Sequence, residues 1–590
     1  MHNNKPTSKA KDSKKAWKSF WVSIKKYRFL IIISIVFAVA SAIVGIFVPK
    51  ILGDMTNIAV ATYPNVDFGA IGQNAIIVIV LFLVSATLNY LQSFIMGVVS
   101  AKYTGDLRMQ IIDKIGKLPI AYFDKHRYGD TLSRMTNDVD VLTTSMSREI
   151  ADVSLSLTTL IGVMVMMLSI SVPLSLISFI VVPISVFTVG QIMRAAQKYF
   201  REQQNTLGVL NSKIEEDYAG LIIVKSNSYE NDALNDFNET NRKLAKVTRK
   251  AQVFSSLSFP VTNVFTNLGY IAVCIIGGIF VIEGRINIGD IQAFIQYVSR
   301  FNRPITEIAS TTATLQSLLA ASERIFDFLY ETEEEPDSNS PLTLDKVKGA
   351  VEFHDVCFGY LKDTPIIRNF SVNVKPGMKV AIVGPTGAGK TTIINLLMRF
   401  YEPNSGYITI DGKPIQEMKR SDVRKLFGMV LQDTWLFSGT IEENLRYGNP
   451  HASLKEIKQA AKASNVNHIV EALPNGYKTE ISEDSDNISA GEKQLITIAR
   501  AMVANPPMMI LDEATSNVDT RTEQLIQDSL EKLTRERTSF VIAHRLSTIR
   551  NSDLILVMRD GAIVESGNHK ELLKLNGFYA ELYNSQFAEN

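Results

Sequence analysis

Long stretches without a charged residue dominate the first half of the chain. They cover residues 29–48, 75–99, 153–193 and 253–282. Because a helix needs about 20 apolar residues to cross a bilayer, each stretch is long enough to form a transmembrane helix. The third stretch is long enough for two helices, with Ser171-Val-Pro173 as the natural turn between them. This pattern predicts five membrane spans.

The distribution of basic residues favours a sixth span at residues 291–321. Residues 51–73 contain no lysine or arginine, whereas residues 100–152 and 194–252 are rich in both. The positive-inside rule places the two basic segments in the cytoplasm. The basic N-terminus and the polar C-terminal half should lie on the same side. Only an even number of spans satisfies all of these conditions, so we expect six.

The sixth span contains three charged residues, Arg300, Arg303 and Glu307. A charge at the bilayer centre costs about 3 kcal/mol on insertion scales, so these side chains require an explanation. They could contact a transported substrate in a water-filled path. Alternatively, their i, i+3, i+7 spacing would let them pair with one another on one helix face. The sequence leaves both interpretations open.

The two long cytoplasmic segments show the apolar periodicity of helices. We therefore expect the membrane helices to continue out of the bilayer and return. The tips should lie near residues 123–130 and 217–221, where Gly129 and Gly220 supply breaks. The alternative is that these segments are solvated amphipathic loops.

The last 240 or so residues alternate charged and apolar positions as soluble α/β domains do. An acidic, turn-rich linker at residues 331–340 separates them from the membrane half. The expected fold is a six-helix membrane domain followed by an α/β domain. The expected boundaries are a basic cytoplasmic segment at 1–28, the membrane domain at 29–325, a linker at 326–349 and the α/β domain at 350–590.

Charge and cysteine content add little. The formal net charge is +1, which gives no reason to expect a nucleic acid as partner. The two cysteines, Cys274 and Cys357, lie far apart in the sequence. We interpret both as buried small hydrophobic residues and not as a disulfide or a metal pair.

A phosphate-binding motif, Gly-x-x-x-x-Gly-Lys-Thr, directly follows the apolar run at residues 380–383. Glycines at this spacing let successive backbone N–H groups converge on phosphate oxygens at a helix N-terminus. Its lysine would reach the β- and γ-phosphates, and its threonine could bind Mg²⁺. The motif runs through Gly384, Pro385, Thr386, Gly387, Ala388, Gly389, Lys390 and Thr391.

A second apolar run, residues 508–511, ends in two carboxylates, Asp512 and Glu513. A buried strand could deliver Asp512 beside the phosphates, where it would hold Mg²⁺ through water. Successive side chains of a strand point in opposite directions, so Glu513 could instead polarise an attacking water. Together with the phosphate motif, this predicts ATP hydrolysis.

These residues resemble the exporter type of ATP-binding cassette (ABC) transporter, in which a membrane domain is fused to one nucleotide-binding domain. Further matching motifs are Phe358-Gly-Tyr360, Gln432 in the Q-loop, Ile488 to Glu492 at the signature position, Ser516 to Asp519 as the D-loop, and Ala543-His544-Arg545. Residues 118–124, continuing through Gly129-Asp130 and residues 134–140, look like the first coupling segment of that family. The resemblance implies that residues 350–590 form a P-loop ATPase domain with a helical subdomain and that ATP and Mg²⁺ are the cofactors. It also implies a dimer in which each ATP joins one chain's phosphate loop to the other chain's signature segment.

The resemblance also implies a role for each site residue. Catalysis would involve Glu513, His544, Gln432 and Lys390, and Mg²⁺ would be held by Thr391, Gln432 and Asp512. ATP would be bound by Tyr360, which would stack on adenine, by the phosphate motif with Thr392, and by Ser489 and Gly491 of the signature.

The signature departs from the family's usual Leu-Ser-Gly-Gly-Gln. Ala490 adds a methyl group where backbone must approach phosphate, and Glu492 adds a negative charge there. A homodimer would carry this weakness in both sites, whereas a heterodimer would confine it to one. The chain thus resembles one subunit of the heterodimeric multidrug exporters of Gram-positive bacteria.

The expected function is ATP-driven export of amphipathic or lipid-like compounds across the plasma membrane, with the N-terminus and the ATPase domain in the cytoplasm. The expected partners are a second, different half-transporter, the lipid bilayer and the cargo, and no nucleic acid. A homodimeric lipid flippase and a nucleotide-gated regulatory or channel protein are the alternatives.

Overall fold

The computed structural model describes residues 12–337, 341–343, 346–361, 364–432, 434–482, 488–512, 519–543 and 549–587. The chain forms two compact units. One, which we call the helical unit, comprises residues 1–117 and 126–332. The other, the α/β unit, comprises residues 333–590 together with the short segment 118–125. Each unit is described by itself.

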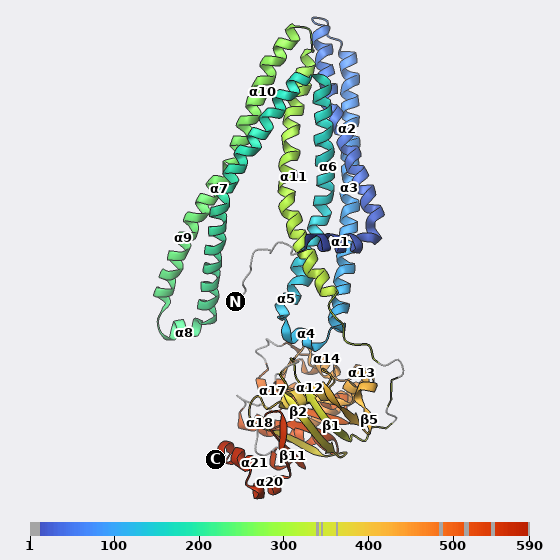
Figure 1. Ribbon diagram of the computed structural model, residues 1–590, viewed down its shortest axis with the longest axis vertical. Coiled ribbons are helices and arrows are strands. Elements are labelled where there is room, and N and C mark those ends of the chain that lie inside the picture. The colour runs from blue at the N-terminus through green and yellow to red at the C-terminus, as the bar shows by residue number, and fades with distance from the viewer. Residues whose placement is uncertain are drawn as a thin grey trace. The chain divides into compact units, whose positions relative to one another are not determined.

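The helical unit is built from long helices (Figure 1). Among its described residues, five helical stretches are long and apolar enough to cross a membrane, as the sequence pattern predicted. The turn at Ser171 is confirmed: one helix ends at Ile170 and the next begins at Val172. The helices are α1 (Ser13–Ser23), α2 (Arg28–Ala61), α3 (Phe68–Lys117), α5 (Tyr128–Ser133), α6 (Val139–Ile170), α7 (Val172–Ala219), α8 (Leu221–Ser226), α9 (Glu230–Ser256), α10 (Ser258–Ile282) and α11 (Ile288–Leu329).

The predicted helical extensions are present. Helices α7 and α9 form a long hairpin closed by α8, and Gly220 ends α7 as expected (Figure 1). Gly129 does not break a helix as predicted, because it lies inside α5. The break comes earlier, after Lys117, where Pro119 restricts the residue before it to extended conformations. The N-terminal segment also contains a helix that was not expected, α1, whose Phe20 side chain is fully buried.

Helix α11 covers residues 291–321, where a sixth span was expected, but it is not among the five described helices that are apolar enough to cross a membrane. Its charged residues bond neighbouring helices. The guanidinium of Arg300 donates to the carbonyl of Gly45 on α2 at 2.7 Å. The hydroxyl of Ser156 on α6 donates to the Glu307 carboxylate at 2.7 Å. The Arg303 side chain lies outside the described residues. Arg300 and Glu307 thus link α11 to the bundle, a structural role that neither interpretation of the sequence included.

Helices α2 and α11 approach closely at a pair of glycines. A side chain on Gly289 would overlap the backbone of Gly53, and one on Gly53 would overlap the carbonyl of Gly289. The amide of Gly289 donates to the side chain of Asn57 at 2.7 Å. Small residues let membrane helices pack backbone to backbone, which fixes this crossing point.

The described part of the α/β unit contains two larger sheets. An antiparallel sheet has the strand order β2-β1-β4-β5, and a mostly parallel sheet has the order β12-β11-β3-β10-β9-β6. The two face each other across a core that includes Phe353, Phe370 and Leu396. Strand bounds are β1 Val351–Phe358, β2 Ile367–Val374, β3 Lys379–Val383, β4 Ser405–Ile410, β5 Lys413–Pro414, β6 Phe427–Val430, β7 Gly439–Thr440, β8 Glu480–Ile481, β9 Met508–Asp512, β10 Thr538–Ile542, β11 Leu554–Arg559 and β12 Ala562–Gly567.

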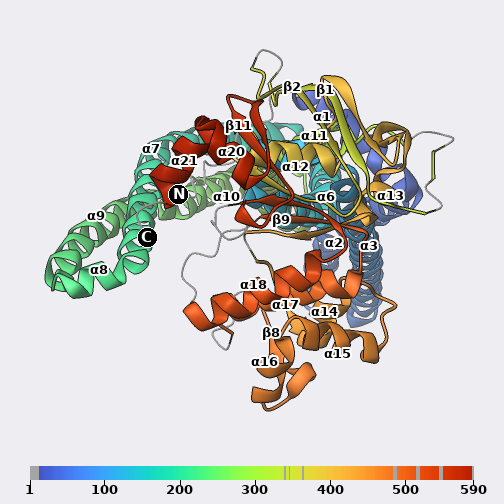
Figure 2. The same cartoon turned by 90° about the horizontal axis from the view of Figure 1, so that it is seen from below.

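A group of helices forms a second lobe of this unit, set apart from β1 and β2 (Figure 2). It has its own core, which includes Ile457, Leu495 and Ile496. The helices of the α/β unit are α4 (Ile120–Lys125), α12 (Lys390–Leu397), α13 (Arg420–Lys425), α14 (Ile441–Arg446), α15 (Leu454–Ala463), α16 (Val466–Ala472), α17 (Ala490–Ala504), α18 (Thr520–Thr534), α20 (His569–Leu575) and α21 (Phe578–Phe587). These observations confirm the expected fold class.

Both cysteines are free and only partly buried. The thiol of Cys357 donates to the side chain of Asn369 at 3.2 Å. The prediction that both cysteines are buried is therefore wrong, because both are partly exposed. The thiol of Cys357 on β1 also lies next to a polar side chain.

The glycine pair gives a stability prediction. We expect Gly289→Ala to destabilise the helical unit by about 1–3 kcal/mol, because the added methyl group forces the two backbones apart. Gly97→Ala on α3 is the matched control, since its methyl group would meet nothing within 4 Å. The stabilities of the two variants would be compared by their apparent unfolding temperatures in the same detergent. An equal effect of the two substitutions would contradict the packing argument.

Candidate active site

The phosphate motif forms a loop that leaves β3 and enters α12. Gly387 and Gly389 have φ angles of 85° and 97°, which only glycine adopts without strain. A side chain on Gly389 would also press on Ile367. Ala388 and Thr392 are buried, whereas Pro385, Thr386 and Thr391 are accessible. The loop is therefore accessible where it enters the N-terminus of α12, a position that suits an anion.

Lys390 is the first residue of α12. Its ammonium donates to the carbonyls of Gly384 and Pro385, at 2.7 and 3.1 Å, so the side chain folds over its own loop. Burial lowers the pKa of Lys390, and the carboxylate of Asp512 opposes that shift. A partly desolvated ammonium at a helix N-terminus binds phosphate more strongly than one in water.

The register of the parallel sheet brings the other predicted residues to the same edge. Ile542 of β10 pairs with Ile382 of β3 on one side and with Asp512 of β9 on the other. Adjacent strands lie about 4.8 Å apart, so Asp512 is about 10 Å from the β3 end that leads into the phosphate loop. Strand β6 is in register with β9 and ends at Val430, which places exposed Gln432 beyond the same edge. Ligands of open α/β sheets bind at this carboxyl edge.

The predicted catalytic residues Glu513 and His544 lie outside the described residues, as do Arg545 and residues 516–518 of the D-loop. Their described neighbours in the chain, Asp512 and Ala543, are at the carboxyl ends of β9 and β10. Asp519 caps α18 by accepting the amides of Arg521 and Thr522 at 3.1 and 3.0 Å.

The predicted adenine-stacking residue, Tyr360, is 38% exposed and belongs to an aromatic group. Its ring meets those of Phe358 and Tyr401 edge to face, at 5.1 and 4.9 Å between centroids. Its hydroxyl accepts from the Asn395 side chain at 3.1 Å. The ring is thus held from several sides with one part accessible.

Sequence reasoning did not find the role of Tyr401. Its hydroxyl donates to the Asp124 carboxylate of α4, within the expected coupling segment. Burial and this bond both raise the pKa of Tyr401. Asp124 belongs to the expected coupling segment, but Tyr401 lies far from it in the sequence and in no motif, so the sequence carries no signal for the pair.

The C-terminal helix was also missed. A cavity of about 90 Å³ lies beside the phosphate loop, between Pro385, Thr386 and Lys390 on one wall and Tyr579, Leu582 and Tyr583 of α21 on the other. The Glu565 carboxylate accepts the first two amides of α21, those of Phe578 and Tyr579, at 2.6 and 3.0 Å. The aromatic i, i+4 spacing indicates a packed helix, but not where it packs.

The signature segment begins α17 in the helical lobe, with Ser489 as N-cap and Gly491 buried. The Glu492 carboxylate accepts from both the amide and the hydroxyl of Ser489, each at 2.8 Å. Ser489 and Glu492 therefore form a capping box. The consequence is that a carboxylate of the chain itself already occupies part of the anion-attracting end of this helix.

Substituting Lys390 tests the phosphate site. We expect Lys390→Met to weaken binding of a fluorescent trinitrophenyl-ATP by about 30-fold, because a charge-assisted bond worth about 2 kcal/mol is lost. Lys574→Met in the last turn of α20 removes an exposed lysine and should leave the affinity unchanged. Equal affinities of Lys390→Met and the parent would rule out this loop as the phosphate site.

Comparisons with known proteins agree with this geometry. Residues 31–305 match the family of ABC transporter transmembrane regions, and residues 367–516 match the ABC transporter family. A fatty acid ABC transporter ATP-binding/permease protein of Mycobacterium bovis is 47% identical over 88% of this chain and 82% of its own length. A Bacillus subtilis protein provisionally named a multidrug export ATP-binding/permease protein is 35% identical, over 84% and 86%.

A third relative is an ATP-dependent lipid A-core flippase of Syntrophus aciditrophicus, which is 34% identical over 87% of this chain and 85% of its own length. These relatives combine both parts in one chain, as the matched ranges do here. The ATP-binding part supports ATP hydrolysis coupled to transport, of lipid or drug type. The chain belongs to the ABC transporter family, as an exporter half-transporter that binds ATP.

Proposed function

We propose that this chain is one half of a heterodimeric exporter that uses ATP hydrolysis to move amphipathic or lipid-like compounds out of the cytoplasm. The observation that supports a different partner chain is the capping box of Glu492 with Ser489. The proposed location is the plasma membrane, with the N-terminus and the α/β unit in the cytoplasm.

The electrostatic argument concerns the partner's ATP. A helix N-terminus stabilises a nearby anion by about 0.3–1 kcal/mol at an exposed site, and free amides add hydrogen bonds. Here the Glu492 carboxylate accepts from the Ser489 amide and hydroxyl at this end of α17, and its charge repels a γ-phosphate. The site served by this signature should therefore hydrolyse ATP weakly.

The phosphate side of the chain has no such defect. Lys390 folds over the phosphate loop, and Asp512 stands at the same edge of the sheet. Completed by a standard signature from a different partner, this side would form a competent site. In a homodimer both sites would combine a sound phosphate loop with a weakened signature, so a heterodimer uses these residues better.

We assign the residues as follows. Tyr360 stacks on adenine, the loop from Gly384 to Thr392 holds the phosphates, and Ser489 and Gly491 face the partner's ATP. Glu513 polarises the attacking water, with His544 and Gln432 completing the catalytic group. Mg²⁺ fits Thr391, Gln432 and Asp512, because the accessible hydroxyl of Thr391 and the carboxylate of Asp512 are oxygen donors and Mg²⁺ takes its other ligands from phosphates and water.

The class of cargo rests on the relatives, which are named for fatty acids, multidrug export and lipid A-core. A homodimeric lipid flippase remains the main alternative, supported by the flippase relative. A nucleotide-gated channel is less favoured, since the sequence keeps Glu513, a residue that hydrolysis needs and gating does not.

Subunit composition tests the heterodimer. The chain, tagged and extracted gently from its native membrane, should appear in an intact-mass measurement with a second polypeptide of similar size in equal amount. A complex containing two copies of this chain alone would show that Ala490 and Glu492 serve both active sites, and the proposal would fail.

Removing the charge of Glu492 tests the electrostatic argument. We expect Glu492→Gln, combined with Ala490→Gly, to raise vanadate-trapped azido-ATP labelling at the partner's phosphate loop several-fold, because the repulsion of the γ-phosphate is relieved. Glu531→Gln on the exposed part of α18 is the control. Unchanged labelling would mean that Glu492 does not weaken this site.

A further inference from the structure

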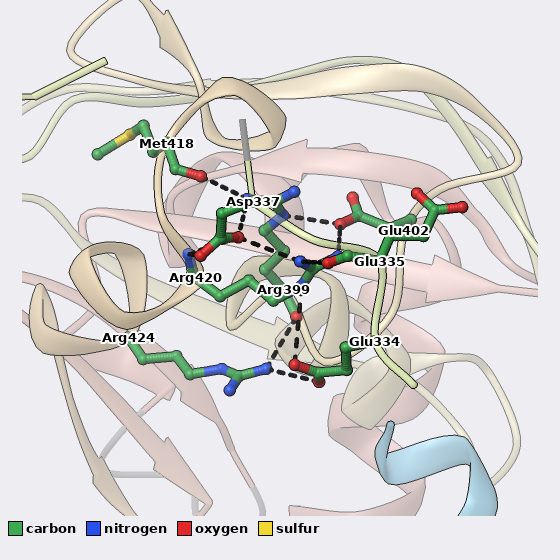
Figure 3. A network of polar contacts seen from close by, with 8 residues as sticks. All are labelled: Glu334, Glu335, Asp337, Arg399, Glu402, Met418, Arg420 and Arg424. Atoms are coloured by element: carbon green, nitrogen blue, oxygen red, sulfur yellow. Dashed lines mark hydrogen bonds and ion pairs between the residues drawn. The ribbon is translucent and has the colours of Figure 1, made fainter. Parts of the chain in front are cut away.

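The acidic linker after α11 is bound tightly to the α/β unit. Three arginines around the end of α12 and in α13 surround its carboxylates (Figure 3). Arg424 pairs with Glu334 at 3.2 Å, and Arg420 pairs with Asp337 at 3.1 Å. Arg420 also donates to the backbone carbonyl of Glu335. We call this set of contacts the arginine clasp.

Two of the three clasp arginines are almost fully buried, so losing their ion pairs costs more stability than losing surface pairs does. The side chains of Arg399 and Arg420 are only 6% and 10% exposed. A buried guanidinium that loses its partners destabilises the protein far more than a surface pair does. Glu402 satisfies part of this charge, at 2.7 Å from Arg399 and 3.1 Å from Arg420. The linker supplies the remaining carboxylates, so the arginines and the linker depend on each other.

The clasp lies at the far end of the phosphate-loop helix. Helix α12 begins at Lys390 and ends at Leu397, and Arg399 is the second residue after it, with a φ of 52°. The Arg399 guanidinium also donates to the carbonyl of Met418 at 2.6 Å. The linker is therefore fixed to the same helix whose first residue holds phosphate.

The other end of the linker is held in the helical unit. Lys114 of α3, which is 6% exposed, donates to the carbonyl of Glu331 at 2.6 Å. Between this bond and the clasp, only residues 332–333 connect the anchors. Among the described residues that follow the clasp, the amide of Leu342 donates to the backbone carbonyl of Glu417 at 3.0 Å.

The clasp thus sets the length of the chain that connects α11 to the α/β unit. With it, the chain between Glu331 and Glu334 can reach about 10 Å when extended. Without it, the chain from Glu331 to Leu342 could reach about 40 Å. A short connecting segment transmits movement of α12 to α11, whereas a long flexible segment changes its own conformation instead.

We propose that residues 331–337 act as a strap, held by Lys114 at one end and by the arginine clasp at the other, that couples movement of α12 to α11. The strap rests on ATP-driven transport by this family and is independent of the cargo and of the partner's identity. In this proposal the clasp arginines position the strap for coupling and take no part in ATP hydrolysis.

Lengthening the strap is the direct test. The insertion Gly-Ser-Gly-Ser between Thr332 and Glu333 adds about 14 Å of extended reach without touching either anchor. The same insertion between Ser340 and Pro341 is the matched control, because it lies beyond the clasp and leaves the connection short. Both are made in the complete transporter, with its natural subunits, in lipid nanodiscs.

Coupling is measured by labelling a single cysteine in the helical unit. Cys274→Ala and Cys357→Ala remove the native thiols, and cysteine is placed in turn at the exposed positions Asn65, Asp67 and Phe68. The position whose maleimide labelling responds most to MgATP with vanadate in the parent is used. ATP hydrolysis is measured on the same preparations.

We expect the insertion at Thr332 to keep ATP hydrolysis within about twofold while the labelling response falls at least fivefold, as slack in a connection predicts. The control insertion should leave both the rate of ATP hydrolysis and the labelling response unchanged. An unchanged response with the first insertion, or an equal loss with both insertions, overturns the proposal.

Neutralising the clasp gives a second test. Glu334→Gln with Asp337→Asn should reproduce the loss of response, whereas Glu331→Gln, which keeps the carbonyl that Lys114 binds, should not. Swapping charges with Asp337→Arg and Arg420→Asp should restore part of the response lost in either single variant. A clasp that only stabilises the fold would lower the unfolding temperature of these variants without changing their response, and that result would refute the strap.

Discussion

The parallel register of β3, β10 and β9 is the constraint on which the rest of the α/β unit depends. It aligns the strand ends so that the phosphate loop, Ala543 and Asp512 emerge at one edge. A nucleotide's phosphates carry several negative charges, and binding them needs amides, an ammonium and metal-binding oxygens within a few ångströms. A slip of one residue along β9 would turn Asp512 to the opposite face of the sheet.

The sequence predicted those parts of the site whose chemistry is local. Gly387 and Gly389 could be found because a loop that takes positive φ needs glycine, and Asp512 because it ends an apolar strand. The capping box of α17 could also have been predicted, because Ser489 and Glu492 have the Ser-x-x-Glu spacing that is typical of one. The five helices that are long and apolar enough to cross a membrane followed from length and hydrophobicity, whereas the expected sixth span rested on the distribution of basic residues.

The parts that could not be predicted depend on residues far apart in the chain. Tyr401 meets Asp124, Glu565 holds the start of α21, and Arg420 meets Asp337. Each contact uses a polar side chain that, by itself in the sequence, would suggest an ordinary surface residue. The composition of the linker indicated only a boundary between the two halves of the chain. The folded chain shows the arginines that bind it.

Helix α4 gives the chain an unusual division. It belongs to the α/β unit, although α3 before it and α5 after it belong to the helical unit. The polypeptide therefore passes between the units after residues 117, 125 and 332, and not once. No single cut separates the two parts: a fragment starting at residue 333 would leave the hydroxyl of Tyr401 without its carboxylate, and recombination between relatives would have to exchange α4 together with the ATPase it serves.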